Sequence, residues 1–346
     1  VTAEVTKKVL LFSRWQAAKL YDKELTKLIQ DLSMEECSAK IKKVTGKSFE
    51  PYRVFLRPIR NKVRLTHQLI ENHLNNNSYL DEKKLIQNKY EITLPLREVR
   101  NSLKLNREDH IANADLLDLM RRVRCFGINL ARLDIRQEAD RHTKLLNELF
   151  RKKYNIKYNS LSEKEKIKLL NKLIKEKNYF VDRIKITNKE NKEVWNTFKQ
   201  ISKTPHECLG AYVISMTSTA SDILSVYFLQ IQAKIKNFLR VVPLFETLDD
   251  LKNANSVMKN LFKLSWYRKM TSAKQEVMIG YSDSSKDAGK LSASWHQYKL
   301  QEELRGLAKK YRFDLVFFHG RGGSPGRGGG PIQATLKSQP AGTVNG

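Results

Sequence analysis

Five short apolar runs, separated by stretches with helical periodicity, constrain the fold of this chain more than any other feature. Strands that alternate with helices pair in parallel, because each helix carries the chain back across the sheet in a right-handed crossover. The pattern therefore predicts an α/β fold with a parallel sheet. The expected strands cover residues 127–135, 211–216, 241–245, 277–280 and 315–318, and the helical stretches between them include residues 220–229 and 292–307.

Charged or titratable residues stand on or near the ends of several expected strands. Arg136, Glu246, Asp283 and His319 are such residues. A (β/α)8 barrel of the TIM type collects its active site at the C-terminal ends of its strands. The sequence therefore favours a partial, distorted barrel within residues 127–346 over an open, doubly wound sheet. A chain of 346 residues can hold one such barrel with insertions or two smaller domains.

The first part of the chain, residues 1–126, is expected to be mainly helical. Residues 9–21 repeat apolar side chains at helical spacing, and residues 115–123 form an amphipathic stretch that begins with an acidic residue. Pro58 is expected to end or kink a helix that opens near residue 51. Residues 80–90 are expected to form a surface helix and a turn.

The formal net charge of +27 has two interpretations. Proteins that bind nucleic acids neutralise phosphates with Lys and Arg. A solvated lysine bias without function is the alternative, and we favour it. Much of the excess lies in residues 151–192, which carry 14 basic against 5 acidic side chains, are rich in Asn, Ile and Tyr, and lack an RNA-binding order of aromatics. We therefore expect residues 151–193 to be a Lys-rich helical insertion with loops, and we expect no nucleic-acid partner.

Other features concern the compartment. No run of about 18 apolar residues occurs, so we expect no membrane span. The N-terminus has neither a basic head nor an apolar segment, so we expect no signal peptide. The three cysteines, Cys37, Cys125 and Cys208, are too few and too widely spaced for a disulfide framework or a zinc site, and they suit a reducing cytoplasm.

A glycine-rich segment follows the last apolar run. Between residues 314 and 331 there are seven glycines and two arginines, Arg321 and Arg327, and the segment begins at His319. Glycine lets successive backbone N–H groups form an anion-binding nest, and arginine supplies paired donors to carboxylate or phosphate oxygens. The segment predicts a site for a phosphorylated or carboxylated small molecule. An RGG-type RNA-binding segment is the alternative, because Arg-Gly-Gly occurs twice.

Glu246 and Asp283 are candidate metal ligands. Each follows an expected strand, and each has a common structural alternative: a carboxylate at a helix N-terminus for Glu246, and an N-cap or Asx-turn for Asp283. Singly, the alternatives are favoured. Together, two carboxylates at separate strand ends beside an anion loop indicate a hard divalent cation such as Mg²⁺.

Lys286 and His319 are the remaining candidates derived from the residues themselves. Lys286 lies three residues after Asp283, so it can pair with that carboxylate or bind a substrate anion. His319 stands where a hydrogen-bond donor to a developing oxyanion would be useful. A strand-end histidine bonded to backbone is its structural alternative.

Two of these segments, residues 277–289 and 318–331, resemble the long glycine-containing motifs of the phosphoenolpyruvate carboxylase family. The first segment matches at all but one position. The shorter segments 133–138, 209–216 and 243–248 are similar to further parts of the family. The resemblance covers nearly the whole chain and is weakest in residues 151–193. Another barrel enzyme that uses phosphoenolpyruvate or pyruvate is the alternative, and the specificity of residues 277–289 argues against it.

The resemblance implies a carboxylase that joins phosphoenolpyruvate and bicarbonate to give oxaloacetate and phosphate, through carboxyphosphate and an enolate. It implies a phosphoenolpyruvate/pyruvate-type barrel, Mg²⁺ or Mn²⁺ as cofactor, a cytoplasmic location and a homotetramer. By position in the motifs, Glu246 and Asp283 correspond to metal ligands, and Arg136 to an arginine that handles the phosphoryl group. Lys286, His319, Arg321 and Arg327 correspond to residues that hold bicarbonate, carboxyphosphate or enolate, and Arg327 also to one that meets an aspartate- or malate-type inhibitor.

The sequence departs from the family pattern at a few positions. Ser285 replaces the usual Gly, which would strain the backbone if that position needs positive φ. Pro325 stands in place of a branched apolar residue, and Ile332 with Gln333 in place of a small residue and a histidine.

Both ends of the chain have the character of cut ends. The family's catalytic-base motif, Thr-Ala-His-Pro-Thr, does not occur in the sequence, and later arginines of the family are not present either. We therefore expect a central part of a single catalytic domain. Alone, it is expected to be inactive and to fold poorly, because a partial barrel leaves open sheet edges.

Overall fold

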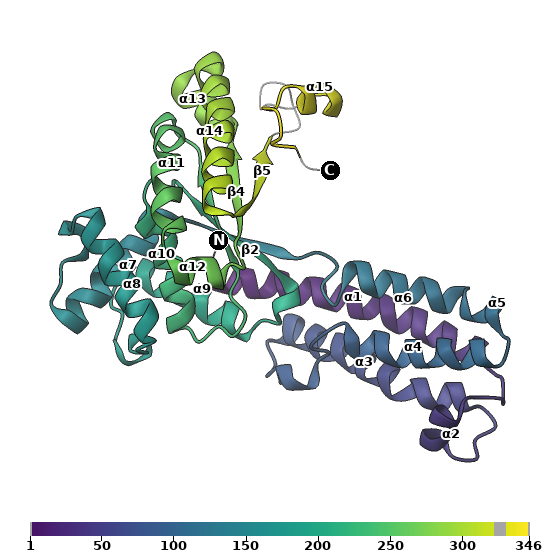
Figure 1. Cartoon of the computed structure of the whole chain (residues 1–346). Coiled ribbons are helices and arrows are strands. Elements are labelled where there is room, and N and C mark those ends of the chain that lie inside the picture. Colours follow the sequence, from purple (N-terminus) through teal and green to yellow (C-terminus); the bar gives the residue numbers. More distant parts are fainter. Residues whose placement is uncertain (1, 322–329, 345–346) are drawn as a thin grey trace. The chain divides into compact units, whose positions relative to one another are not determined.

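The computed structural model describes residues 2–321 and 330–344. The chain forms two compact units (Figure 1). One, the helical unit, comprises Val1–Leu133 and Thr204–Leu209; the other, the sheet unit, comprises Asp134–Lys203 and Gly210–Gly346. Each unit has its own buried core, so each is described by itself.

The helical unit is built around four long helices that pack in a ring. In it α1 contacts α3 and α6, and α4 likewise contacts α3 and α6, so the helices run alongside one another (Figure 1). The helices predicted over residues 9–21 and 115–123 are confirmed, since they lie within α1 and α6. The elements of this unit are α1 (Ala3–Asp31), α2 (Ala39–Thr45), α3 (Pro51–Asn76), η1 (Glu82–Lys84), α4 (Tyr90–Leu105), α5 (Asp109–Ala112), α6 (Asp115–Phe126) and η4 (His206–Cys208).

Two local expectations in this unit were wrong in part. The helix that Pro58 was expected to end or kink does not end there, because α3 continues to Asn76. Leu56, Ile59 and Val63 are buried on either side of the proline, and the packing of that face outweighs the one backbone hydrogen bond that proline removes. Residues 80–90 form a loop with a single 3-10 turn instead of a surface helix.

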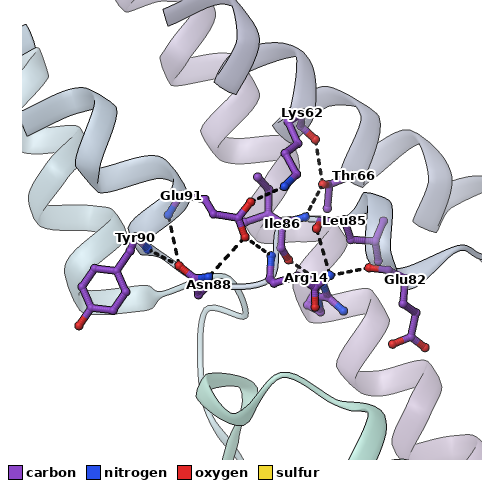
Figure 2. A network of polar contacts seen from close by, with 10 residues as sticks. Arg14, Lys62, Thr66, Glu82, Leu85, Ile86, Asn88, Tyr90 and Glu91 are labelled. Carbon is purple, nitrogen blue, oxygen red and sulfur yellow. Dashed lines mark hydrogen bonds and ion pairs between the residues drawn. The ribbon is translucent and has the colours of Figure 1, made fainter. Parts of the chain in front are cut away.

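The loop between α3 and α4 is fixed by a polar network around a buried arginine (Figure 2). Arg14 of α1 is 3% exposed, and its Nη2 donates to the Ile86 carbonyl at 2.8 Å. The Ile86 N–H donates to the Thr66 hydroxyl at 3.0 Å. Glu91 of α4 pairs with Lys62 of α3 and accepts from the Gln87 N–H at 2.8 Å. Burial lowers the pKa of Arg14, which is the cost of placing a guanidinium inside a helical core.

The sheet unit contains five strands in the order β1-β2-β3-β4-β5. Neighbours from β2 to β5 pair in parallel, with Val213 opposite Val242 and Met278 opposite Phe318 as examples of the register. The predicted α/β fold with a parallel sheet is confirmed for these strands. Their bounds are β1 (Leu133–Glu138), β2 (Leu209–Ser215), β3 (Arg240–Phe245), β4 (Lys274–Gly280) and β5 (Asp314–Gly320).

The first strand lies later in the sequence than expected. Residues 127–132 form turns in which Gly127 and Leu130 have φ of 60° and 55°, values that extended strands do not adopt. The strand therefore begins at Leu133, and Arg136 lies within it instead of after it. Asp134 ties β1 to β2, because its Oδ1 accepts from the Ala211 N–H at 2.6 Å.

Helices cover the sheet and position its ends. All 13 residues of α10 are buried, and α10 contacts α7, α8, α9, α11 and β3. The Lys-rich segment supplies α8, which buries Leu170, Leu173 and Ile174 in contact with α10. Helices α11, α13 and α14 lie alongside one another (Figure 1). The helices of this unit are α7 (Ala139–Tyr154), η2 (Tyr158–Ser160), α8 (Glu163–Glu176), η3 (Val181–Arg183), α9 (Lys189–Lys203), α10 (Ala220–Gln232), α11 (Leu248–Phe262), α12 (Ser265–Met270), α13 (Ser282–Ala288), α14 (Lys290–Tyr311) and α15 (Ile332–Lys337).

Candidate active site

Glu246 is the centre of a polar cluster at the C-terminal ends of the strands. It directly follows β3, and its side chain is 5% exposed. Its Oε2 accepts from Arg136 Nη2 at 3.2 Å, and its Oε1 accepts from the Met216 N–H at 3.0 Å. Met216 follows β2 with φ of 54°, a conformation that costs a non-glycine residue about 1–3 kcal/mol. Three neighbouring strands thus converge on one buried carboxylate.

Glu246 does not cap the helix that follows it. Helix α11 begins with a capping box in which the Thr247 hydroxyl accepts from the Asp250 N–H at 3.1 Å, and Asp250 accepts in return from the Thr247 N–H at 3.1 Å. Asp250 therefore satisfies the helix terminus, and the Glu246 carboxylate is directed to Arg136 and Met216.

Gly280, the last residue of β4, allows the next strand to approach Glu246 closely. A Cβ at position 280 would lie 3.1 Å from the Glu246 Cβ and 3.2 Å from its Cα. Such distances are shorter than ordinary carbon contacts, and part of the obstacle is backbone. The glycine in this motif is therefore required by the site and not by a turn.

Asp283 lies three residues after Gly280 in the sequence, in the first turn of α13. It is not the N-cap, which is Tyr281. Lys286, one turn later, places its Nζ 3.3 Å from the Asp283 Oδ1, so the pairing predicted for these residues is confirmed. The pKa of Glu246 is raised, first by burial and further by the neighbouring Asp283 carboxylate, against the opposing effects of the Met216 N–H and Arg136. The two carboxylates are therefore close enough to repel each other.

The chemistry of this pair fits a hard divalent cation. A cation between two carboxylates would offset both their repulsion and the burial of Glu246. Within residues 2–321 and 330–344, no group of three or more His, Cys, Asp or Glu side chains is arranged to hold a metal ion. Two carboxylates are nevertheless a sufficient protein contribution for Mg²⁺, which keeps waters and substrate oxygens as its remaining ligands.

His319 and Arg321 meet at Tyr281, which directly follows the neighbouring strand β4. His319 lies in β5, and its Nδ1 is 2.9 Å from the Tyr281 hydroxyl. Arg321 donates from Nη2 to the same hydroxyl at 3.2 Å, and its guanidinium lies 4.7 Å from the centre of the Tyr281 ring. Burial and then the charge of Arg321 lower the pKa of His319. The imidazole is therefore neutral near pH 7, bonded to a side chain and not to the backbone.

The structure places six of the seven predicted site residues on β1 and β5 and on the segments that follow β3, β4 and β5. Arg136 is half exposed at 52%, so it can reach a substrate while it holds Glu246. Arg327 and Pro325 lie outside the described residues. Ser285 lies in helical α13, so the strain considered for it does not arise. Gln333 is an exposed residue of α15.

Sequence reasoning missed two contributors to the site. Tyr281 stands between Gly280 and Asp283 in the segment that was singled out, but no role was assigned to it. Its position directly after a strand, two residues before a candidate ligand, was the available signal. Met216 contributes only its backbone N–H, and nothing in a side chain could reveal that.

The comparisons with known proteins identify the family of the chain. The family model described as phosphoenolpyruvate carboxylase matches residues 1–346. A curated phosphoenolpyruvate carboxylase of Photorhabdus laumondii is 42% identical over 348 residues, covering 100% of this chain and 40% of the relative. Those of Pectobacterium carotovorum and Escherichia coli O1:K1 are 44% and 43% identical and are covered to 40% and 39% of their length.

A helix-rich α/β protein with a buried carboxylate at the end of a strand is thus the class that the fold and the site define. The chain belongs to the phosphoenolpyruvate carboxylase family, because the family model matches its whole length. It spans about 40% of the length of the curated relatives that it matches.

Proposed function

We propose that the intact protein containing this chain is a carboxylase that converts phosphoenolpyruvate and bicarbonate into oxaloacetate and phosphate. The observation that carries the proposal is the convergence of Arg136, Met216 and Asp283 on the buried carboxylate of Glu246. Enolate and phosphate both carry charge that develops during this reaction. A cluster of fixed donors around a metal-binding carboxylate pair is suited to stabilising such charge.

The site residues have distinct roles in this proposal. Glu246 and Asp283 would hold Mg²⁺ or Mn²⁺, which supplies Lewis-acid stabilisation of the substrate oxygens. Arg136, held by Glu246 at 3.2 Å, would bind the phosphoryl group as bicarbonate attacks it. Lys286, His319, Arg321 and Arg327 would hold bicarbonate, carboxyphosphate and enolate until CO₂ and the enolate combine.

The proposal also covers the architecture, the oligomeric state and the location of the intact protein. We propose that the five strands, whose spatial order equals their sequence order, are part of an eight-stranded barrel and that residues 1–346 are the central part of a single catalytic domain. The barrel, a homotetramer and an aspartate- or malate-type inhibitor at Arg327 follow from the family resemblance. A cytoplasmic location is the compartment that the free cysteines suit.

RNA binding and a membrane-spanning helix are the two remaining points. The RNA-binding alternative has no support, since the carboxylase family model accounts for every residue of the chain. No helix in the described part of the chain combines the length and the apolar character that crossing a bilayer requires.

Replacing Arg321 by Ala in the intact protein tests the proposal. Oxaloacetate formation should fall below detection while the thermal unfolding temperature stays within a few degrees, because Arg321 lies at the edge of the site, where it donates to the Tyr281 hydroxyl and lies over its ring. Lys310→Ala, an exposed lysine of α14, is the control and should leave turnover unchanged. Turnover like that of the wild type in Arg321→Ala would refute the assignment.

A further inference from the structure

Tyr281 links the two neighbouring candidates of the anion site. Its hydroxyl lies 2.9 Å from His319 Nδ1 and 3.2 Å from Arg321 Nη2, and its ring lies under the Arg321 guanidinium at 4.7 Å. The residue comes directly after β4, and the other two come from the end of β5 and the residue beyond it. One side chain therefore connects the strand that leads to Asp283 with the strand that leads to the glycine-rich segment.

The hydrogen-bond inventory of the three groups gives the bond a direction. A guanidinium can only donate, so the Tyr281 oxygen accepts from Arg321. The phenol has one proton of its own, and among the described residues His319 Nδ1 is the acceptor within reach. If Nδ1 carried the proton instead, the tyrosine hydroxyl would accept twice and its proton would have no partner among the described side chains. The charge of Arg321 beside the oxygen also makes the phenol a stronger donor.

We propose that Tyr281 is a positioning residue that holds His319 in the neutral tautomer with its proton on Nε2, and that fixes Arg321 beside it. His319 then presents an N–H donor, and not a lone pair, to the anions that bind at this site. The hydrogen bond at Nδ1 sets the tautomer, because the hydrogen bond that one ring nitrogen makes generally decides the protonation of the other. That the anions are carboxyphosphate and enolate rests on the proposed function.

The proposed tautomer suits an enolate intermediate. A neutral imidazole N–H stabilises an oxyanion by hydrogen bonding but does not release its proton to carbon. An imidazolium in the same place is an acid, and protonation of the enolate at its methylene carbon gives pyruvate instead of oxaloacetate. Carboxyphosphate formed in that turnover would break down to CO₂ and phosphate. Pyruvate and CO₂ would then leave separately, because the carbon–carbon bond that joins them in oxaloacetate has not formed. Burial and Arg321, which lower the pKa of His319, act in the same direction.

The wild-type protein itself provides the first test. In the intact protein labelled with 15N at histidine, long-range nitrogen–proton correlation spectra distinguish Nδ1-protonated from Nε2-protonated rings. The His319 signal is assigned by its loss in His319→Gln. We expect the Nε2-protonated pattern near pH 7, and an Nδ1-protonated or doubly protonated ring would overturn the proposal.

Tyr281→Phe is the second test, because it keeps the ring under Arg321 and removes the hydroxyl. We expect the His319 signal to shift to a mixture of tautomers, kcat for oxaloacetate to fall about 10- to 100-fold, and the ratio of pyruvate to oxaloacetate to rise. The KM for phosphoenolpyruvate should change little. Tyr311→Phe, at the end of α14, is the matched control and should change none of these quantities.

The two readouts separate this inference from the proposed function. The tautomer is measured without turnover, so the predicted spectra in a protein that makes no oxaloacetate would refute the function and leave the role of Tyr281 standing. An unchanged His319 spectrum in Tyr281→Phe, in a protein with full carboxylase activity, would refute the role of Tyr281 alone.

Discussion

Two arginines, one in each unit, show how the same side chain serves packing in one place and chemistry in another. Arg14 of the helical unit is 3% exposed, and its guanidinium donates to the Ile86 carbonyl in a core that links α1, α3 and α4. Arg136 of the sheet unit has a side chain that is 52% exposed, and its partner is the carboxylate of Glu246.

The two guanidinium groups differ in their access to water and to a substrate anion. Arg14 is enclosed, so removing it leaves a buried carbonyl without its donor, and the cost falls on stability. Arg136 keeps water on one side and an anionic partner on the other, so it can bind a substrate anion without leaving Glu246. A charged residue is a candidate for function when it combines such access with a partner that is itself buried.

Arg136→Ala should have the largest effect, and on catalysis. We expect kcat/KM for oxaloacetate formation in the intact protein to fall at least ~10³-fold, or about 4 kcal/mol, because the phosphoryl group loses its charged donor. The free energy of unfolding should change by less than about 1 kcal/mol, as is usual for half-exposed ion pairs. Steady-state kinetics and urea denaturation measure the two quantities. A loss of stability that matches the loss of activity would remove the distinction between the arginines.

Arg14→Met should have the opposite profile. The methionine fills much of the same volume but leaves the Ile86 carbonyl without its donor at 2.8 Å. We expect a loss of about 2 kcal/mol of stability and unchanged kcat per folded molecule. Thermal denaturation with activity titration checks this. Arg121→Met, whose side chain is 66% exposed in α6, is the matched control and should be near neutral. A stable but inactive Arg14→Met would give Arg14 a functional role.

Gly280→Ala should damage the site through sterics alone. The added Cβ would lie 3.1 Å from the Glu246 Cβ, and relief requires Glu246 to move away from Arg136 and Met216. We expect activity to fall about tenfold or more with a stability loss of about 1 kcal/mol. Gly306→Ala in α14 is the control, because a Cβ there meets nothing within 4 Å and alanine favours the helix. Equal activity in the two variants would mean that the Glu246 position is not critical.

His142→Gln should have the smallest effect near pH 7, and the difference from the wild type should grow as the pH falls. His142 is fully buried, its Nε2 lies 2.7 Å from the Tyr212 hydroxyl, and burial lowers its pKa to about 3. The unfolded chain binds a proton near the ordinary histidine pKa while the folded chain does not. Stability is therefore lost as pH falls through the region between them, by up to about 1.4 kcal/mol per pH unit from this residue.

Urea denaturation at pH 6, 5 and 4 measures that dependence. The wild type should lose stability more steeply than His142→Gln, and His110→Gln, whose side chain is 76% exposed, should follow the wild type. Identical slopes in wild type and His142→Gln would contradict the buried neutral state.

The sequence predicted the periodic parts of the fold and the side chains with charge. Four of the five apolar runs lie within or almost within strands. A strand that is buried on both faces of a parallel sheet is a continuous apolar run, so it can be recognised without knowing what it packs against. The first strand was displaced because residues 127–132 adopt positive φ at Leu130, which no propensity predicts. Likewise, α3 passes Pro58 because of what it packs against.

For the site, the sequence indicated which residues carry charge but not how they meet. Thr247 and Asp250 cap α11, whereas the Glu246 carboxylate accepts from Arg136 and the Met216 N–H, and this division depends on the folded backbone. The Met216 N–H and the hydroxyl of Tyr281 are contributors whose role depends on position alone. Motif resemblance assigned roles to residues; the contacts give the physical reason for some of those roles.

Mn²⁺ binding to the intact protein, followed by electron paramagnetic resonance, tests the central claim that Glu246 and Asp283 hold one cation at the strand ends. We predict one site per chain, weakened at least tenfold in Glu246→Gln and in Asp283→Asn. Asp287→Asn is the control, because Asp287 lies in the same helix and accepts from the Leu248 N–H at 2.8 Å. Affinity for Mn²⁺ that is unchanged in either ligand variant would contradict the account.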